Sequence, residues 1–90
     1  MIERTFAFDP GKHAALIARR GIDFLVVSAV FNDRQRVDYA DTRFEYGEER
    51  RVTVGKVDGS FFTVVYTLRD DVTWLITAWP SSRKKRARYG

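Results

Sequence analysis

The N-terminal third of the chain changes from a two-residue hydrophobic period to a helical one. Residues Arg4–Phe8 alternate, with Phe6 and Phe8 on one face, which predicts a short strand. Asp9-Pro10 predicts the start of a helix, because aspartate accepts from free backbone N–H groups and proline fits the first helical position. Gly21, preceded by two arginines, predicts its end in a left-handed cap. The apolar stripe of this helix consists of Ala14, Ile17 and Ala18.

A second helix is predicted after Asp23, which can cap it. The residues that recur there at helical spacing are Phe24, Val27, Ser28 and Phe31. The β-branched pair Val26-Val27 also suits a strand, so a strand is the alternative. We favour the helix, which Asn32-Asp33 would end.

The C-terminal half has the pattern of a β-sheet. Residues Arg34–Tyr39 alternate charged and apolar side chains like an edge strand, and residues Asp41–Glu49 read as a polar loop. Three further strands are predicted at Arg51–Val57, Phe61–Leu68 and Val72–Trp79. Because only short turns join them, at Asp58-Gly59-Ser60 and Arg69-Asp70-Asp71, they must form an antiparallel meander. The middle strand is apolar on both faces and is expected at the centre, with the helices covering one face.

Two tryptophans lie on the last predicted strand. Trp74 and Trp79 are five residues apart, so simple alternation places them on opposite faces. Trp74 shares its face with Val72, Ile76 and Ala78 and is expected in the core. Trp79 faces the other way, where it can stack on an unpaired base or hold the C-terminal segment against the sheet.

Composition locates the positive charge in one segment. The chain has 90 residues and a net charge of +4, and five cations lie within its last ten residues, so the part before them is close to neutral. Ser81 or Ser82 can cap a short basic helix that runs to Tyr89. Such a segment suits polyphosphate, although it can equally be a solubilising end with no specific role.

Length and composition bound the class of protein. Ninety residues fit a single domain, 1–90, with one core. The absence of cysteine excludes a disulfide scaffold and a thiolate zinc site, and it fits a reducing compartment. The longest apolar runs are far shorter than the roughly 20 residues that span a bilayer. We therefore expect a cytoplasmic protein with no membrane contact.

Few residues suit the familiar catalytic constellations. The single histidine, His13, falls early in the first helix and is expected at the surface rather than as a general base. Acidic residues that could bind Mg²⁺ if they converged are Asp38, Asp41, Glu45, Glu48 and Glu49. They lack a ligand spacing, so a solvated loop is favoured. No metal site and no cofactor is expected.

Six segments, in order, resemble the BrnT family of ribonuclease toxins from type II toxin-antitoxin systems. Phe6–Lys12, for example, is similar to the family's opening F-x-W/F-D-x-x-K. The other similar segments are Arg20–Phe24, Ala29–Asp33, Gly47–Gly55, Val64–Arg69 and Ile76–Lys84. The chain departs from the family pattern at Arg20 in place of histidine, Trp74 in place of arginine, Trp79-Pro80 in place of arginine and a basic residue, and Lys85 in place of glutamate.

The resemblance implies an α+β, RelE-like fold, in which an antiparallel meander is packed by two N-terminal helices and followed by a short basic C-terminal helix. It also implies RNA cleavage without a metal, in which cations stabilise the charge that builds up when the ribose 2′-OH attacks the adjacent phosphate. The phosphate-contacting catalytic set carried over from the matching segments is Arg50, Arg69, Arg83, Arg86 and Tyr89. Further nucleic-acid contacts are expected from Lys84, Lys85, Arg88 and Trp79.

The implied partners are an RNA substrate and a ribbon-helix-helix antitoxin of BrnA type, with operator DNA bound only through the antitoxin complex. The two lost arginines leave a second hypothesis, a cleavage-deficient relative that binds antitoxin or nucleic acid. A third hypothesis, a plain nucleic-acid-binding domain, would be favoured if the adjacent reading frame encoded no small antitoxin.

Overall fold

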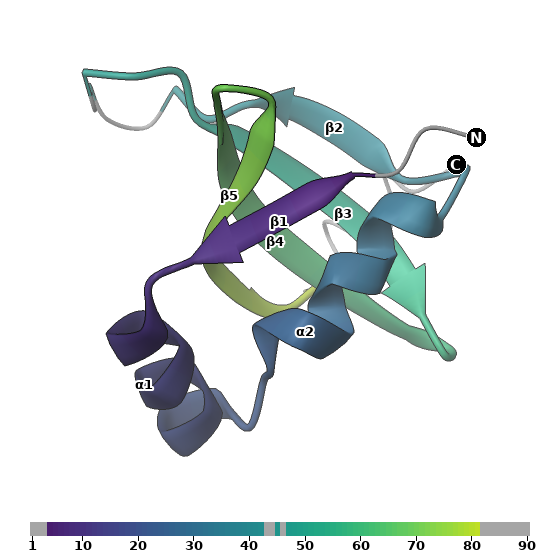
Figure 1. Cartoon of the computed structure of the whole chain (residues 1–90). Helices are drawn as coiled ribbons and strands as arrows, with labels where there is room; N and C mark the ends of the chain where they lie inside the picture. The colour runs from purple at the N-terminus through teal and green to yellow at the C-terminus, as the bar shows by residue number, and fades with distance from the viewer. Residues whose placement is uncertain (1–3, 43–44, 46, 82–90) are drawn as a thin grey trace.

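A computed structural model describes residues 4–42, 45 and 47–81 of the chain. The strands among them form one five-stranded sheet in the order β1-β5-β4-β3-β2 (Figure 1). The elements, in chain order, are β1 Thr5–Phe8, α1 Pro10–Arg20, α2 Phe24–Val27, the 3₁₀ helix η1 Ser28–Asn32, β2 Val37–Ala40, β3 Arg51–Val57, β4 Ser60–Arg69 and β5 Val72–Pro80. The basic helix predicted up to Tyr89 lies outside the described residues.

The predicted meander is confirmed, with β4 between β3 and β5 and antiparallel to both. Asp58 and Gly59 in the first turn have φ angles of 48° and 84°, and Asp70 and Asp71 in the second have 50° and 65°. Positive φ at both central residues matches the right-handed twist of the strands, and aspartate tolerates this conformation better than most residues.

The expectation of a purely antiparallel sheet is wrong at one edge, because β1 runs parallel to β5. The pairing extends from Thr5 opposite Val72 to Phe8 opposite Leu75. Parallel neighbours need a long crossover, and the helices together with β2, β3 and β4 supply it. Beyond Leu75, no described strand pairs with this edge of β5.

Helix α1 has the predicted ends but a different buried face. Asp9 accepts a hydrogen bond from the Gly11 N–H at 2.7 Å, and Gly21 closes the helix with a φ of 66°. The predicted apolar stripe is wrong, since Ala14, Ile17 and Ala18 are exposed, Ile17 to 44%. Leu16 is the buried residue of α1 and packs in the core. The face of Leu16 meets β5, and that contact sets the orientation of α1.

The second helix is confirmed, although it is shorter than its period suggests. Asp23 caps α2 by accepting from the Leu25 N–H at 2.8 Å, and after four residues the chain tightens into η1. Phe24 and Val27 are buried, and Phe31 packs against the core. Figure 1 shows α2 and the following turns lying in front of the sheet.

Strand β2 lies at the sheet edge as predicted, but it begins later than expected. Asp33 holds the preceding residues in a turn, since its carboxylate accepts from the Gln35 N–H at 2.9 Å and its carbonyl from the Arg36 N–H at 3.2 Å. An aspartate that bonds the backbone two residues on competes with strand formation. The alternation over Arg34–Tyr39 therefore begins inside a turn.

The core lies between the helices and one face of the sheet. Gly55 of β3 allows η1 to approach, because a Cβ there would lie 2.9 Å from Cγ1 of Val30. Phe6 and Phe8 both pack against the core, as their shared face predicts. The buried cluster contains Leu16, Ile22, Phe24, Val27, Val30, Val64, Tyr66, Leu75 and Ala78.

A β-bulge in β5 overturns the expectation for the tryptophans. Tyr66 pairs with Leu75 and Val65 with Thr77, so Ile76 has no partner on β4. Trp74 pairs with Thr67 and Trp79 with Thr63, which lie on the same face of β4. Both tryptophans thus share one face, opposite the one with Val64 and Tyr66. Leu75, 1% exposed, fills the core position predicted for Trp74.

Candidate functional site

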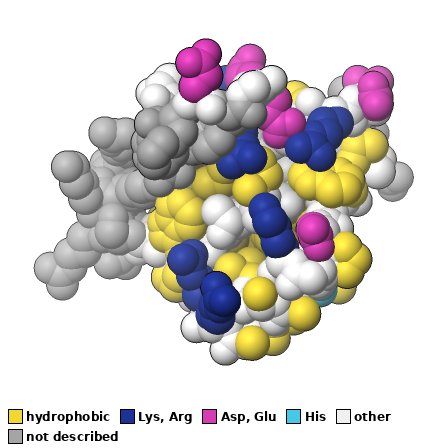
Figure 2. All heavy atoms as spheres, turned by 90° about the vertical axis from the view of Figure 1, so that its left-hand side faces the viewer, with side chains coloured by type: hydrophobic (Ala, Val, Ile, Leu, Met, Phe, Trp, Pro, Cys, Tyr) yellow, Lys and Arg dark blue, Asp and Glu magenta, His cyan; other side chains and the backbone are white. Residues whose placement is uncertain are grey.

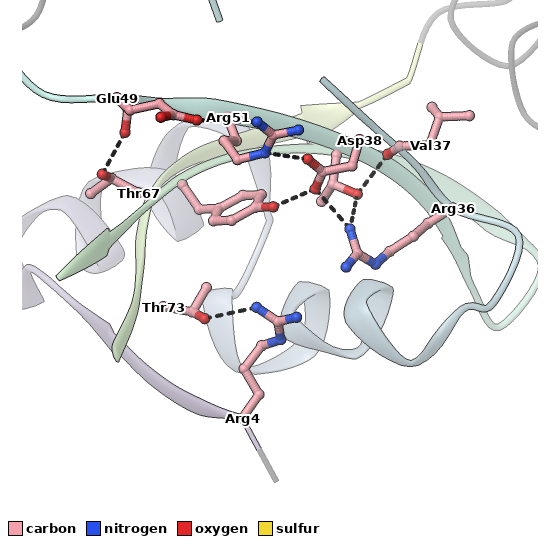
Figure 3. Close-up of polar contacts among 10 residues, drawn as sticks. Arg4, Arg36, Val37, Asp38, Glu49, Arg51, Thr67 and Thr73 are labelled. Atoms are coloured by element: carbon pink, nitrogen blue, oxygen red, sulfur yellow. Dashed lines mark hydrogen bonds and ion pairs between the residues drawn. The ribbon is translucent and has the colours of Figure 1, made fainter. Parts of the chain in front are cut away.

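Arginines gather at one end of the sheet, where β1, β3 and β5 begin and β2 and β4 end. We call this region the arginine end, and Figure 3 shows part of it. Its pairings bring together residues that are far apart in the chain, because Arg51 lies opposite Tyr66 on β4 and Ala40 on β2. The arginines of this region are Arg4, Arg50, Arg51 and Arg69, joined by Arg36, which precedes β2 and reaches Asp38 with its side chain.

Asp38 is the acceptor at the centre of the arginine end. Its carboxylate accepts from Nη1 of Arg36 at 2.8 Å and from Nε of Arg51 at 2.5 Å (Figure 3). The Tyr66 hydroxyl donates to the same carboxylate. Arg36 also donates to the Thr53 hydroxyl at 2.9 Å. Three donors, from β3, from β4 and from the residue before β2, therefore fix one half-buried carboxylate.

The Asp38 network also sets the protonation of its members. Burial, and then the hydrogen bond to Asp38, raises the pKa of the Tyr66 hydroxyl above its ordinary value. The hydrogen bond to Asp38 raises the pKa of the Arg51 guanidinium. A protonated tyrosine and a charged arginine thus persist beside Asp38 over the physiological pH range.

Phe31 anchors two of these arginines. The Cζ atoms of Arg4 and Arg36 lie 4.7 and 4.9 Å from the centre of its ring, and the Tyr66 ring packs edge-on at 4.9 Å. Arg4 also donates to the Thr73 hydroxyl at 3.1 Å. A guanidinium over an aromatic face gains electrostatic energy and loses side-chain freedom. Both arginines are therefore held in defined positions.

Glu48 brings together the two predicted catalytic arginines that the structure describes. Arg69 binds its carboxylate through two nitrogens, with distances of 2.8–3.1 Å, while Nε of Arg50 lies 4.0 Å from it. The Cζ of Arg69 also lies 5.1 Å from the centre of the Trp74 ring. The prediction did not include Glu48 in the site, although it stands two residues before Arg50.

Trp79 does not lie near this pair. It pairs with Thr63, and Arg69 lies six positions further along β4, about 20 Å away at about 3.4 Å per residue. At that end, Arg20 donates to the Ala78 carbonyl at 3.0 Å, and its Cζ lies 5.8 Å from the Trp79 ring centre. Two positions at which the chain departs from the family pattern, 20 and 79, are thus in contact. The remaining predicted site residues, Arg83, Lys84, Lys85, Arg86, Arg88 and Tyr89, lie outside the described residues.

The sequence prediction missed the Asp38 network. Arg36, Asp38 and Arg51 belong to stretches of alternating or paired charges that read as solvated surface. The available signal was the Arg-x-Asp spacing on an edge strand, which places both side chains on one face. Tyr66 was interpreted only as part of an apolar strand.

His13 is not the surface residue that the sequence suggested. Its ring packs edge-on against Phe8 at 4.6 Å between centroids, and Nε2 lies 2.7 Å from a carboxylate oxygen of Asp23. This hydrogen bond, and then that from the Leu25 N–H, lowers the pKa of Asp23. His13 therefore links α1 to the cap of α2. Within the described residues, no three His, Cys, Asp or Glu side chains are grouped to hold a metal ion.

The fold and the site define a small α+β domain whose polar centre is built from arginines, a tyrosine and carboxylates. A family model described as the ribonuclease toxin BrnT of type II toxin-antitoxin systems matches residues 8–85. The chain therefore belongs to the BrnT toxin family, and the resemblance seen in its segments is confirmed. A search of curated proteins finds no match. None of the helices in the described part is both long and apolar enough to cross a membrane.

Proposed function

We propose that this protein is a metal-independent endoribonuclease of RelE-like fold that arrests growth by cutting RNA. The observation that carries the proposal is the convergence of Arg50 and Arg69 on one carboxylate, that of Glu48, at one end of the sheet. Attack of a ribose 2′-OH on the neighbouring phosphate builds negative charge on the phosphorane, and guanidiniums in fixed positions stabilise that charge without a metal. Their fixed placement also reduces the entropy lost on reaching the transition state.

Arg69 is the member best suited to reach a phosphate. Its side chain is 49% exposed, and it already binds Glu48 in the two-nitrogen geometry that suits a phosphate as well as a carboxylate. A phosphate of the RNA would take the place of Glu48 beside Arg69. Arg50 lies next to the same carboxylate and would contact the same or an adjacent phosphate.

The C-terminal residues complete the proposed site. Arg83, Arg86 and Tyr89 would join Arg50 and Arg69 at the scissile phosphate, by analogy with the matching family segments. Lys84, Lys85 and Arg88 would bind flanking phosphates, with an affinity that falls as salt rises. Trp79 would stack on an unpaired base.

Membership of a type II family implies an antitoxin protein as partner. We infer that this partner is a ribbon-helix-helix protein of BrnA type, which would cover the toxin and bind operator DNA as part of the complex. The toxin, its RNA substrate and the antitoxin would then meet in the cytoplasm.

Cleavage assays with and without EDTA test the chemistry. Purified protein should cut RNA equally in both, and the 5′ fragments should end in 2′,3′-cyclic phosphates, because the 2′-OH is the nucleophile. Arg69→Ala should reduce the rate about 100-fold, the usual cost of one lost charge-stabilising donor. Arg34→Ala, which removes an exposed arginine of the turn before β2, should leave the rate unchanged. An EDTA-sensitive activity would overturn the mechanism.

Growth assays test the biological effect. Expression of the chain without the adjacent reading frame should halt growth and translation, and co-expression with that frame should restore both. Unimpaired growth of cells that contain soluble, folded protein would contradict a toxin.

A cleavage-deficient relative is the second candidate, and the tryptophans favour it. Trp74 and Trp79 stand where the family pattern has arginines, and their rings hold Arg69 and Arg20 instead. Under this alternative the wild type does not cut RNA, and Trp79→Arg restores cutting. RNA cleavage by the wild-type protein would exclude this alternative.

A further inference from the structure

A groove with a basic rim lies between α1 and the free edge of β5. Its volume is about 350 Å³, and α1 contributes Lys12, Ala15, Leu16, Arg19 and Arg20, which share one helical face. Ile76 and Thr77 form the opposite wall. The bulge explains this wall, because the unpaired residue turns the strand and aims its side chain away from the regular alternation.

The cations of this groove differ from those of the arginine end in forming no ion pair with any described carboxylate. No carboxylate lines the groove, and the structure gives neither Lys12 nor Arg19 a carboxylate partner among the described residues. Arg20 satisfies a backbone group instead, the Ala78 carbonyl on the free edge of β5. In the lower part of Figure 2, Lys and Arg side chains lie beside mostly hydrophobic and uncharged surface.

We propose that this groove receives an acidic, amphipathic segment of the antitoxin. Carboxylates of the segment would pair with Lys12 and Arg19, and its apolar side chains would cover Ala15 and Ile76. The inference rests on the proposed function for the existence of that partner, and it adds where and by which chemistry the partner docks.

The lining favours a peptide over an RNA strand. Phe24 is the aromatic residue of the groove lining and is 1% exposed, so its ring offers no face for a base to stack on. The floor is aliphatic, which suits apolar side chains better than ribose and phosphate. Beyond Leu75 no described strand pairs with the β1 side of β5, so a peptide can pair with the edge there, apart from the Ala78 carbonyl that Arg20 occupies.

Charge reversal tests the rim. The toxin with Lys12→Glu and Arg19→Glu should bind the purified product of the adjacent reading frame at least about tenfold more weakly than wild type, mainly through slower association. Two charges are reversed, so a matched control carries Arg34→Glu and Lys56→Glu, two exposed positions away from the groove. This control should bind as wild type does. Equal losses in both doubles, or none in either, would overturn the proposal.

Filling the groove tests the floor. Ala15→Trp should weaken antitoxin binding, whereas Ala14→Trp, at the neighbouring exposed position outside the groove, should not. Circular dichroism and thermal melts of both variants confirm that α1 is folded. Equal binding by the two variants would contradict docking in the groove.

RNA cleavage separates this proposal from the proposed function. The rim double variant should cut RNA as fast as wild type in the absence of antitoxin while resisting inhibition. A loss of RNA binding that matches the loss of antitoxin binding would make RNA the occupant and overturn the peptide proposal. If wild type proves unable to cut RNA but still binds antitoxin through the rim, the proposed function fails and the groove assignment stands.

Discussion

The arginine end and the α1–β5 groove both carry several cations, but they hold them differently. At the arginine end, Asp38 and Glu48 fix the guanidiniums by short hydrogen bonds. In the groove, Lys12 and Arg19 form no side-chain ion pair with a described carboxylate, and the Asp9 carboxylate beside Lys12 accepts from backbone N–H groups instead. In Figure 2, Asp and Glu lie among the cations of the upper part and beside the cation near the centre, whereas the cations at the lower left have none next to them.

The difference indicates what each region can do. Catalysis of phosphate chemistry needs donors that are already in place, because reorganisation during the reaction raises the barrier. Docking of a charged partner needs an electrostatic potential at the surface, which speeds the encounter of the two proteins. Mobile side chains can supply this potential. Counterions that fix the arginines therefore favour catalysis at the arginine end, whereas counterions in the groove would weaken the docking of a charged partner.

The largest effect is expected when the counterion at the centre of the arginine end is removed. Asp38→Asn removes the negative charge and one of the two acceptor oxygens that Arg36, Arg51 and Tyr66 share, and it should lower the free energy of unfolding by about 2–4 kcal/mol. Lys12→Gln in the groove should change it by less than about 0.5 kcal/mol. Urea denaturation measures the loss of unfolding free energy in both variants. Similar losses would contradict the difference drawn between the arginine end and the groove.

Replacing arginine by lysine separates geometry from charge. Arg69→Lys keeps the charge but loses the two-nitrogen contact, so cleavage should fall about tenfold, roughly 1.4 kcal/mol. Arg19→Lys in the groove should alter antitoxin affinity by no more than about twofold, because only its charge is used. An unaffected Arg69→Lys enzyme would show that the arginine end also needs charge alone.

Removing the competitor of the phosphate should strengthen RNA binding. Glu48→Gln frees Arg69 from its carboxylate, and RNA affinity should rise severalfold at low salt, with a steeper salt dependence. Glu49→Gln, one residue away and with the same change of charge, should raise it less, since Glu49 binds Arg51 rather than Arg69. Fluorescence anisotropy with labelled RNA measures both, and equal gains would mean that only net charge matters.

The smallest effect concerns pH and the helix that carries the groove. The pKa of Asp23 is lowered by His13 and by the Leu25 N–H, so its ionised form stabilises the folded state above the ordinary aspartate pKa. That contribution is lost as the pH falls through the lowered pKa. The stability difference between wild type and Asp23→Asn should therefore shrink between about pH 5 and pH 2. A constant difference in urea midpoints over this range would exclude the His13–Asp23 link as its source.

Local chemistry made most of the fold predictable. Asp9, Gly21 and Asp23 end or begin helices through contacts within three or four residues, and the turn at Asp58-Gly59 depends on its own backbone angles. The order of the three meander strands follows from short connections alone. Such features need no knowledge of distant residues.

The misplaced features depend on distant partners. The parallel pairing of β1 requires β5, which lies more than 60 residues later, and the orientation of α1 depends on which side chain meets the sheet. The Asp38 network draws on Arg51 and Tyr66 from two other strands. In the sequence each of these residues has an adequate local explanation, as a surface charge or an apolar strand position, and nothing signals their convergence.

The bulge at Ile76 has a consequence for comparing relatives position by position. One unpaired residue inverts the sidedness of everything that follows it, so the side chains of Trp74 and Trp79 lie on the same face although they are five positions apart. An aligned column beyond Ile76 thus has the same spatial meaning in two family members only if both contain the extra residue or both lack it. Insertion or deletion of a single amino acid in β5 would move the side chains at the end of the strand to the opposite face of the sheet, although none of those residues would change in type.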